Sequence, residues 1–195
     1  MPDPVAIGFD TSAAHCAAAL LRGNDVLAHL SEEMTKGQAE RLFPLLESLL
    51  AGAGLGWRDL NVIGVGIGPG NFTGIRIAVA AARGLALSLG IPAVGVSATE
   101  AAALDLPRPC RVVLPLRADQ VVWQDFGGEE SRPHQTIQGS LPPGPALAEP
   151  LVPTVVAIAR IALARRTTPG LRPAPLYLRP ADAAPARDAP PLILP

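Results

Sequence analysis

The order of the apolar segments predicts an α/β fold in which helices cover a mixed β-sheet. Three short apolar runs, at residues 5–9, 61–67 and 93–96, have the length and composition of buried strands. Segments with a helical spacing of apolar residues separate them, at residues 36–54 and 75–89.

A hairpin is predicted directly after the first strand. The apolar runs 16–21 and 26–30 flank Gly23, Asn24 and Asp25, which are typical of a turn between antiparallel strands. The helix that follows contains Pro44, and a proline inside a straight helix costs about 3 kcal/mol. We therefore expect a kink at this position.

After about residue 106 the pattern changes. The segments 111–116 and 121–126 are predicted to pair as strands, and residues 154–165 to form a helix. Prolines crowd the rest, and because proline lacks a backbone donor, the end of the chain is expected to be extended or disordered. The predicted organisation is an N-terminal lobe at residues 1–105, a reduced second lobe at 106–179 and a proline-rich tail at 180–195.

The composition is apolar and nearly neutral. Hydrophobic residues make up 49% of the 195 residues, charged residues 17%, and the mean hydropathy is +0.31. Such a chain has more apolar surface than one small core needs, which favours a partner that covers part of it. The net charge of −1 gives the whole chain no attraction for nucleic acid. Six arginines stand against two aspartates after residue 150, and both a solvated tail and an RNA contact remain open as explanations.

The cysteines and the N-terminus indicate the compartment. Cys16 and Cys110 have no CxxC partner, so buried thiols in a reducing environment are expected. The N-terminus lacks the basic region and the long apolar core of a signal peptide. The longest apolar stretch, residues 75–89, contains Arg76 and Arg83 and is too short to span a bilayer. We expect a cytoplasmic protein with no membrane contact.

Two loops at strand ends are candidates for binding phosphate. Residues 66–74 lead from a predicted strand into a helix, whose first backbone N–H groups attract anions. This loop lacks the lysine of a P-loop, and Thr73 stands where the dinucleotide motif needs glycine, so Thr73 is expected to cap the helix instead. Asp10 follows the first strand and offers a carboxylate. The predicted cofactor-binding residues are Asp10, Thr11, Ser12, Gly68, Gly70, Thr73 and Gly74.

Both loops also have a simpler explanation. Glycines permit a tight crossing against the sheet, and Asp, Ser and Thr side chains tighten turns by bonding to their own backbone.

Side chains suited to catalysis are few. His15, His29 and His134 are scattered and form no paired metal-binding motif. Glu32 and Glu33 are adjacent in a predicted strand, so their side chains point in opposite directions. We predict no catalytic residue and no metal site, and hence a chain that is not itself an enzyme.

The helix predicted at residues 75–89 is apolar on nearly every side. Large residues alternate with alanine and glycine, and Arg76 and Arg83 share one edge because seven residues make two turns. The sheet covers one side of this helix and the preceding helix covers another. The remaining face predicts a helix-to-helix contact with a second protein, unless the C-terminal segment of the chain folds over it.

Several segments resemble the bacterial TsaB (YeaZ) family. They are VAIGFDTSAAHCAAALL, KGQAERLFPLLESLL, GIGPGNFTGIRIAVAAARGLALSLGIPAVGVS and the later PLYLRPADA. The resemblance is close from residue 5 to about residue 103 and loose after residue 106. It implies the actin-like ATPase (RNase H-like) fold, with a reduced second lobe.

The resemblance also implies a function. The chain would be a non-catalytic scaffold subunit of the complex that installs threonylcarbamoyl on N6 of adenosine 37 in tRNAs that read ANN codons. Its partners would be a TsaD-like catalytic subunit and a TsaE-like ATPase, with tRNA bound only within the complex and a homodimer in isolation. No cofactor is firmly implied, although ATP is possible through the complex.

The resemblance places the contact with the partner in a helix bundle. A charge at Ala81 or Ala82 is then expected to break this contact and leave the fold intact. The implied interface residues are Leu42, Phe43, Leu46, Arg76, Val79, Ala80, Arg83 and Leu87.

The chain departs from the family pattern at two places. Residues 114–117, LPLR, stand where the family usually has aspartate followed by Ala-Arg, and Gln38 stands where histidine is frequent. A short second lobe argues against closure of two lobes on a nucleotide. Two other functions remain open, a small actin-like phosphotransferase or ATPase that uses Asp10 and the loop 68–74, and a metallopeptidase.

Overall fold

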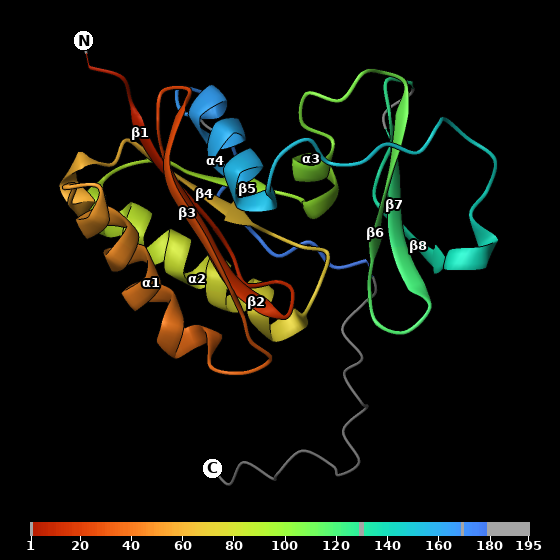
Figure 1. Ribbon diagram of the computed structural model, residues 1–195, viewed down its shortest axis with the longest axis horizontal. Coiled ribbons are helices and arrows are strands. Elements are labelled where there is room, and N and C mark those ends of the chain that lie inside the picture. Colours follow the sequence, from red (N-terminus) through yellow and green to blue (C-terminus); the bar gives the residue numbers. More distant parts are fainter. Residues whose placement is uncertain (1, 129–130, 169, 179–195) are drawn as a thin grey trace, which may run out of the picture.

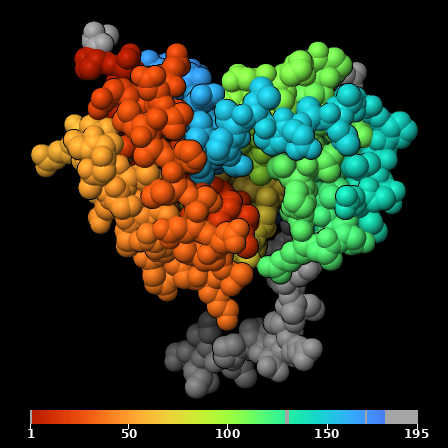
Figure 2. Space-filling model, viewed as in Figure 1, coloured from red at the N-terminus to blue at the C-terminus, as the bar shows by residue number. Residues whose placement is uncertain are grey.

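Two β-sheets lie side by side in the computed structural model, which describes residues 2–128, 131–168 and 170–178 (Figure 1). The first sheet has five strands and the second has three. In Figure 2 the second sheet, in green and teal, occupies one side of the molecule, and the N-terminal half occupies the other. The tail predicted at residues 180–195 lies outside the described residues.

The five-stranded sheet is mixed, as predicted, with the strand order β3-β2-β1-β4-β5. β1 pairs antiparallel with β2 and parallel with β4, and β4 pairs parallel with β5. The hairpin of β2 and β3 is antiparallel, so the predicted strands and hairpin are confirmed. The strands are β1 (Val5–Asp10), β2 (His15–Arg22), β3 (Asp25–Glu33), β4 (Val62–Gly66) and β5 (Ala93–Val96).

Two helices, α1 (Gln38–Gly52) and α2 (Phe72–Leu89), cover one face of this sheet (Figure 1). Phe9, Ile63 and Leu46 lie between the helices and the sheet and are fully buried. α1 follows β3 and α2 follows β4, and these two strands run in the same direction. The two helices therefore both start beyond the carboxyl ends of these strands, and they run parallel to each other.

A third helix, α4 (Thr154–Arg165), covers the opposite face, where two glycines let it come close. A Cβ atom at Gly8 would lie 2.7 Å from the carbonyl oxygen of Val155, and one at Gly64 would lie 2.8 Å from that of Ile158. This helix was predicted to belong to the second lobe at residues 106–179. Its contacts are instead with the first sheet, because the second face of that sheet would otherwise be open to water.

The second sheet is an antiparallel meander of β6 (Cys110–Pro115), β7 (Gln120–Phe126) and β8 (His134–Ile137). The pairing of the first two strands is the predicted one. β8 was missed because it has only four residues and lies directly after a proline. The short helix α3 (Ala98–Ala102) packs between the two sheets.

Arg111 on β6 holds the proline-rich segment in place. Its buried guanidinium forms a bidentate ion pair with Asp125 on β7, with N–O distances of 2.5 and 2.7 Å. This hydrogen-bonded carboxylate raises the pKa of Arg111 above its usual value. The backbone of Arg111 also accepts from Ala148 N–H and donates to Ala146 C=O, both at 2.9 Å. The prolines therefore lie against an ordered strand.

The ends of the helices differ in part from the predictions. The cap of α2 is Asn71, whose side-chain oxygen accepts the N–H of Gly74 at 3.0 Å, whereas Thr73 is exposed in the first turn. Asn71 was overlooked because the cap was placed two residues too late. α1 runs through Pro44 without a break, and the kink there stays a prediction.

α2 also corrects an expectation about membranes. It has 18 residues with a mean hydropathy of 1.4, so by length and composition alone it passes as a membrane-spanning candidate. The expectation that this stretch is too short was wrong, because the helix begins at Phe72 and not at Ile75. A helix that packs on a sheet gives the same signal, which makes it weak evidence for a membrane.

Candidate functional site

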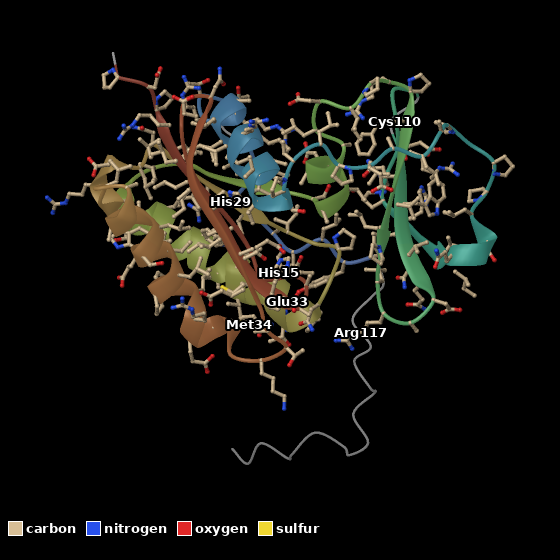
Figure 3. The ribbon with its side chains drawn as sticks, in the orientation of Figure 1. His15, His29, Glu33, Met34, Cys110 and Arg117 are labelled. Atoms are coloured by element: carbon tan, nitrogen blue, oxygen red, sulfur yellow. The ribbon has the colours of Figure 1, made fainter. Side chains whose placement is uncertain are left out.

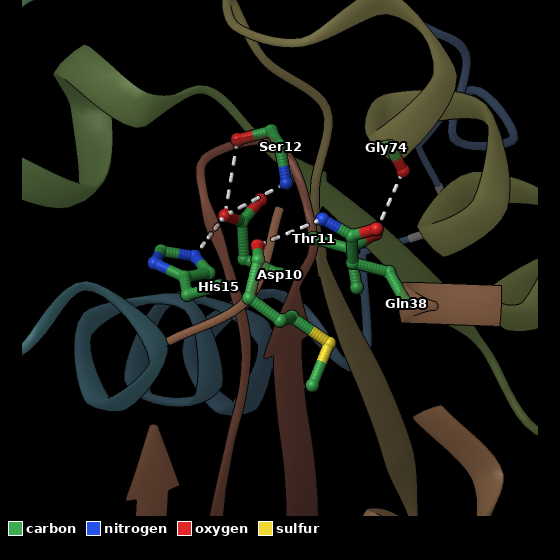
Figure 4. Close-up of polar contacts among 7 residues, drawn as sticks. Asp10, Thr11, Ser12, His15, Gln38 and Gly74 are labelled. Carbon is green, nitrogen blue, oxygen red and sulfur yellow. Dashed lines mark hydrogen bonds and ion pairs between the residues drawn. The ribbon is translucent and has the colours of Figure 1, made fainter. Parts of the chain in front are cut away.

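The loop after β1 is closed by its own side chains (Figure 4). Asp10 Oδ2 accepts hydrogen bonds from Ser12 N–H at 3.1 Å and from Ser12 Oγ at 3.0 Å. The same oxygen lies 2.8 Å from His15 Nε2, and the carboxylate is buried. One oxygen atom thus serves three partners within the chain.

The two candidate phosphate loops touch each other. Thr11 Oγ1 donates to the carbonyl oxygen of Gly74 at 2.7 Å, and Asn71 N–H donates to the carbonyl oxygen of Ser12 at 2.6 Å. The approach is so close that a Cβ atom at Gly74 would lie 1.8 Å from the oxygen of Thr11, and one at Gly70 would lie 2.4 Å from that of Ser12. The structure therefore brings Thr11 and Ser12 against Gly70 and Gly74 beyond the carboxyl ends of β1 and β4. Gly68 lies against Ile75 instead, and Thr73 is exposed.

Because the two loops are so close, backbone N–H groups that could bind an anion are already hydrogen-bonded within the chain. The N–H of Asn71 binds Ser12, and the N–H of Gly74 binds the side chain of Asn71. Thr11 is fully buried, and its hydroxyl is already bound to Gly74. The geometry favours the simpler explanation of a tight crossing, and binding of a nucleotide by these residues stays a prediction.

His15 was passed over in the sequence, although it is the titratable side chain best placed beside this loop. Its ring lies on β2 opposite Glu33 on β3, and the two side chains lie close together in Figure 3. They line an open hollow of about 730 Å³ with Ala14, Ser31, Met34 and Thr35. The signal that was available is the five-residue spacing from Asp10, which spans a tight turn between adjacent strands.

No group of three or more His, Cys, Asp or Glu side chains that is suited to a metal ion occurs in the described parts of the chain. His29 lies on β3 of the first sheet, opposite Ala19 on β2, and His134 lies on β8 of the second sheet.

The outer surface of α1 and α2 divides the predicted interface residues into two groups. Leu42, Leu46 and Val79 are buried in the core of the chain itself, so their placement at an interface was wrong. Their apolar spacing indicated the sheet-facing side of each helix. The exposed residues of the set are Phe43, Arg76, Ala80, Arg83 and Leu87.

The exposed members on α2 form one stripe together with the exposed Gly84. We call it the α2 stripe, and it consists of Arg76, Ala80, Arg83, Gly84 and Leu87. Leu87 is 85% exposed, and a Cβ atom at Gly84 would have no neighbour within 4 Å. Ala82 is buried and Ala81 packs against the core, so a charge at either position would disturb the fold and not only a contact. The burial of these residues contradicts the expectation that such a charge would leave the fold intact.

Charges of opposite sign mark the two helices. Glu40 and Glu47 are exposed on α1, and Arg76 and Arg83 are exposed on α2, with a separation of seven residues in each helix. Among the described residues, none of these four side chains forms an ion pair. The face is therefore acidic on one helix and basic on the other.

Residues 170–178, which we call the strap, reach the first turn of α2. Tyr177 lies against Phe72 with ring centroids 5.0 Å apart, and Arg76 Nε donates to the hydroxyl of Tyr177 at 2.8 Å. The guanidinium carbon of Arg76 lies 3.7 Å from the centre of the Phe72 ring. The described part of the C-terminal segment thus covers one end of α2 and leaves Ala80, Gly84 and Leu87 exposed.

Comparisons with known proteins decide the family. The sequence profile of TsaD, described as tRNA N6-adenosine threonylcarbamoyltransferase, matches residues 27–127. An uncharacterized protein of Mycobacterium tuberculosis is 33% identical over 198 residues, which covers 92% of this chain and 93% of that protein. The Escherichia coli tRNA threonylcarbamoyladenosine biosynthesis protein TsaB is 32% identical over 130 residues. The chain belongs to the TsaB (YeaZ) family.

The likeness to TsaB of Escherichia coli covers 64% of this chain and 56% of that protein. A solved structure of YeaZ from Pseudomonas aeruginosa extends the TsaB-family likeness over 90% of this chain and all of that one, with a TM-score of 0.68 and 26% identity. The predicted α/β fold is thereby confirmed over nine-tenths of the chain.

Proposed function

We propose that this chain is a non-catalytic subunit of the machinery that makes threonylcarbamoyladenosine at position 37 of tRNAs that read ANN codons. It acts in the cytoplasm, where it pairs with a TsaD-like catalytic subunit and serves a TsaE-like ATPase. Support comes from the names of its relatives and from the TsaD profile that covers α1 and α2. Contact with tRNA occurs only within the complex.

The observation that carries the proposal is the α2 stripe. It places Leu87 in water, next to two small residues over which another helix can pass closely. Burial of one leucine side chain contributes about 1.5–3 kcal/mol, so a partner helix on this stripe would gain contacts that the described part of the chain does not make. Phe43 is a second exposed apolar side chain, on α1.

The loop after β1 supports a subunit without chemistry of its own. The Asp10 carboxylate and the Thr11 hydroxyl are both buried and both form hydrogen bonds within the chain. If ATP acts in this system, the complex would supply its site.

Capture from the native cytoplasm tests the pairing. The wild-type chain is expected to retain a TsaD-like protein, and Leu87→Glu is expected to lose it because a buried carboxylate without a partner is costly. Leu147→Glu is the matched control, since Leu147 is 67% exposed on the other half of the molecule. Equal capture by Leu87→Glu and by the control would contradict the proposal.

In isolation we expect the same face to join two copies of this chain. The carboxylates of α1 and the arginines of α2 have the same separation, so α1 of one copy placed on α2 of another aligns both pairs. Twofold symmetry then repeats the contact, which makes the face complementary to itself.

Charge exchange tests this crossed pairing. Glu40→Arg with Glu47→Arg puts arginine against arginine, and Arg76→Glu with Arg83→Glu puts glutamate against glutamate. Each double variant is expected to sediment as a monomer, and an equal mixture of the two to form dimers again. A mixture that stays monomeric while the wild type dimerises would show that α1 does not face α2 of the second copy.

A second candidate function is a small phosphotransferase or ATPase, which the hollow beside Asp10 and His15 favours. Titration with ATP and magnesium, together with a hydrolysis assay, separates the two. Turnover that is lost in Asp10→Ala would support the enzyme. A metallopeptidase would instead require stoichiometric metal in the purified chain.

A further inference from the structure

The strap leads the end of the chain onto the partner face. Pro173 is buried and lies 3.5 Å from the place of a Cβ atom on Gly95 of β5. Leu176 N–H donates to the carbonyl oxygen of Ile67, just after β4, at 2.8 Å. These contacts carry the strap past the carboxyl ends of β5 and β4 to the start of α2.

At that point the strap already competes for a residue of the α2 stripe. The Nε of Arg76 is bound to the Tyr177 hydroxyl, and its guanidinium lies over the Phe72 ring. A partner that needs Arg76 in another position must first release Tyr177. The strap is thus both an anchor and an occupant of one end of the stripe.

The chain that follows is long enough to reach the other end. Leu87 lies 15 residues beyond Phe72, or about 22 Å along a helix with a rise of 1.5 Å per residue. From Leu178 to Leu192 there are 14 residues, which span about 43 Å at ~3.1 Å each in a proline-rich segment. The reach exceeds the requirement about twofold.

The residues at the end of this segment match the open part of the stripe. After Leu178 the only large apolar residues are Leu192, Ile193 and Leu194. The open part consists of Ala80, Gly84 and Leu87, which are apolar and exposed in the part of the chain that the structure describes.

We propose that the C-terminal tail is an intramolecular competitor for the α2 stripe. Leu192, Ile193 and Leu194 cover Ala80, Gly84 and Leu87 when the chain is alone, and a partner subunit displaces them. The inference rests on the proposed function, because it assigns regulation to the same surface. Only chains whose tail is released can bind a partner. The apparent dissociation constant is therefore the intrinsic one divided by the fraction of chains with a released tail.

Cross-linking within one chain tests the position of the tail without any partner. Cysteines at Leu87→Cys and Ile193→Cys are treated at high dilution with a short bismaleimide, while Cys16 and Cys110 stay buried. The control pairs Ile193→Cys with Asn24→Cys, in the exposed turn at the same end of the sheet as the end of α2. We expect the first pair to link at least tenfold faster than the control. Equal rates would overturn the proposal.

Self-association of the full chain gives the second test. Leu192→Asp, Ile193→Asp and Leu194→Asp together are expected to lower the dimer dissociation constant at least tenfold, because the stripe becomes free. Ala183→Asp, Ala184→Asp and Ala186→Asp add the same charge to the tail and should leave the constant unchanged. An unchanged constant in the first variant contradicts the competitor. If neither form dimerises or binds a TsaD-like subunit, the proposed function fails, and the cross-linking rates still report on the tail.

Discussion

At the residue scale, Gly74 determines how close α2 comes to the loop after β1. The carbonyl oxygen of Thr11 occupies the space that any side chain at this position would need. The same contact aligns the Thr11 hydroxyl with the carbonyl of Gly74. The absence of a side chain here therefore fixes both loops of the candidate site.

Gly74→Ala is expected to destabilise the fold by at least ~3 kcal/mol, because the new methyl group would collide with backbone atoms that cannot turn away. Gly84→Ala in the same helix is the matched control. Its Cβ would meet nothing within 4 Å, so the better helix propensity of alanine should stabilise the fold by about 0.5–1 kcal/mol. Urea unfolding measures both, and two substitutions with the same sign would contradict the geometry.

Cys16 gives the core a measurable dependence on pH. Burial, with a smaller contribution from the charge of Glu32, raises the pKa of this thiol from 9.0 to about 11. The unfolded chain therefore releases the proton first, so stability is fully present below pH 9 and falls as the pH rises toward 11. The loss between pH 8 and 10.5 is expected to be about 2 kcal/mol.

Unfolding of the wild type and of Cys16→Ala at both pH values isolates this group. The variant will be less stable overall but should lack that part of the alkaline loss. A loss of equal size in both proteins would show that Cys16 does not titrate differently on folding.

At the scale of elements, α2 shows which signals a sequence carries. Its existence follows from the apolar spacing, and its end follows from Gly90. In the structure this glycine has a φ of 67°, which is typical of a residue that ends a helix. Its beginning was misjudged, because Asn71 and Thr73 are both good caps and only the backbone tells which one lies outside the first turn. Which of its apolar residues face outward also needed the position of the sheet.

Asn71→Ala is expected to cost about 1 kcal/mol of stability through loss of the cap on Gly74 N–H. Thr73→Ala should change stability by less than ~0.5 kcal/mol, since Thr73 is exposed inside the first turn. Thermal unfolding of the two variants distinguishes them. A larger effect at Thr73 would restore it as the cap.

At the scale of the whole molecule, the order of strands and helices along the chain was predictable. The contacts between segments that are distant in the sequence were not. Hydrophobic runs and turn residues specified the mixed first sheet and the β6–β7 pair. The position of α4 depends on Gly8 and Gly64, whose role appears only when the helix lies on them. The strap could not be predicted either, because the contact of Arg76 with Tyr177 joins residues 101 positions apart.

The same limit applies to the candidate site. The sequence indicated both loops after the strands but not that Thr11 and Asn71 would join them. It indicated an over-apolar helix but placed buried residues such as Val79 at the partner surface. Burial depends on the tertiary packing, and periodicity alone cannot distinguish the side that faces the sheet from the side that faces a partner.

The central claim is that the α2 stripe binds a second subunit. Calorimetric titration of the full chain with a purified TsaD-like subunit from the same cell, using wild type and Gly84→Arg, tests it most directly. Among the described residues, nothing lies within 4 Å of a Cβ atom at Gly84, so the fold should survive arginine there. We predict that affinity falls at least ~100-fold, or about 2.7 kcal/mol. Equal affinities for the two proteins would contradict the account.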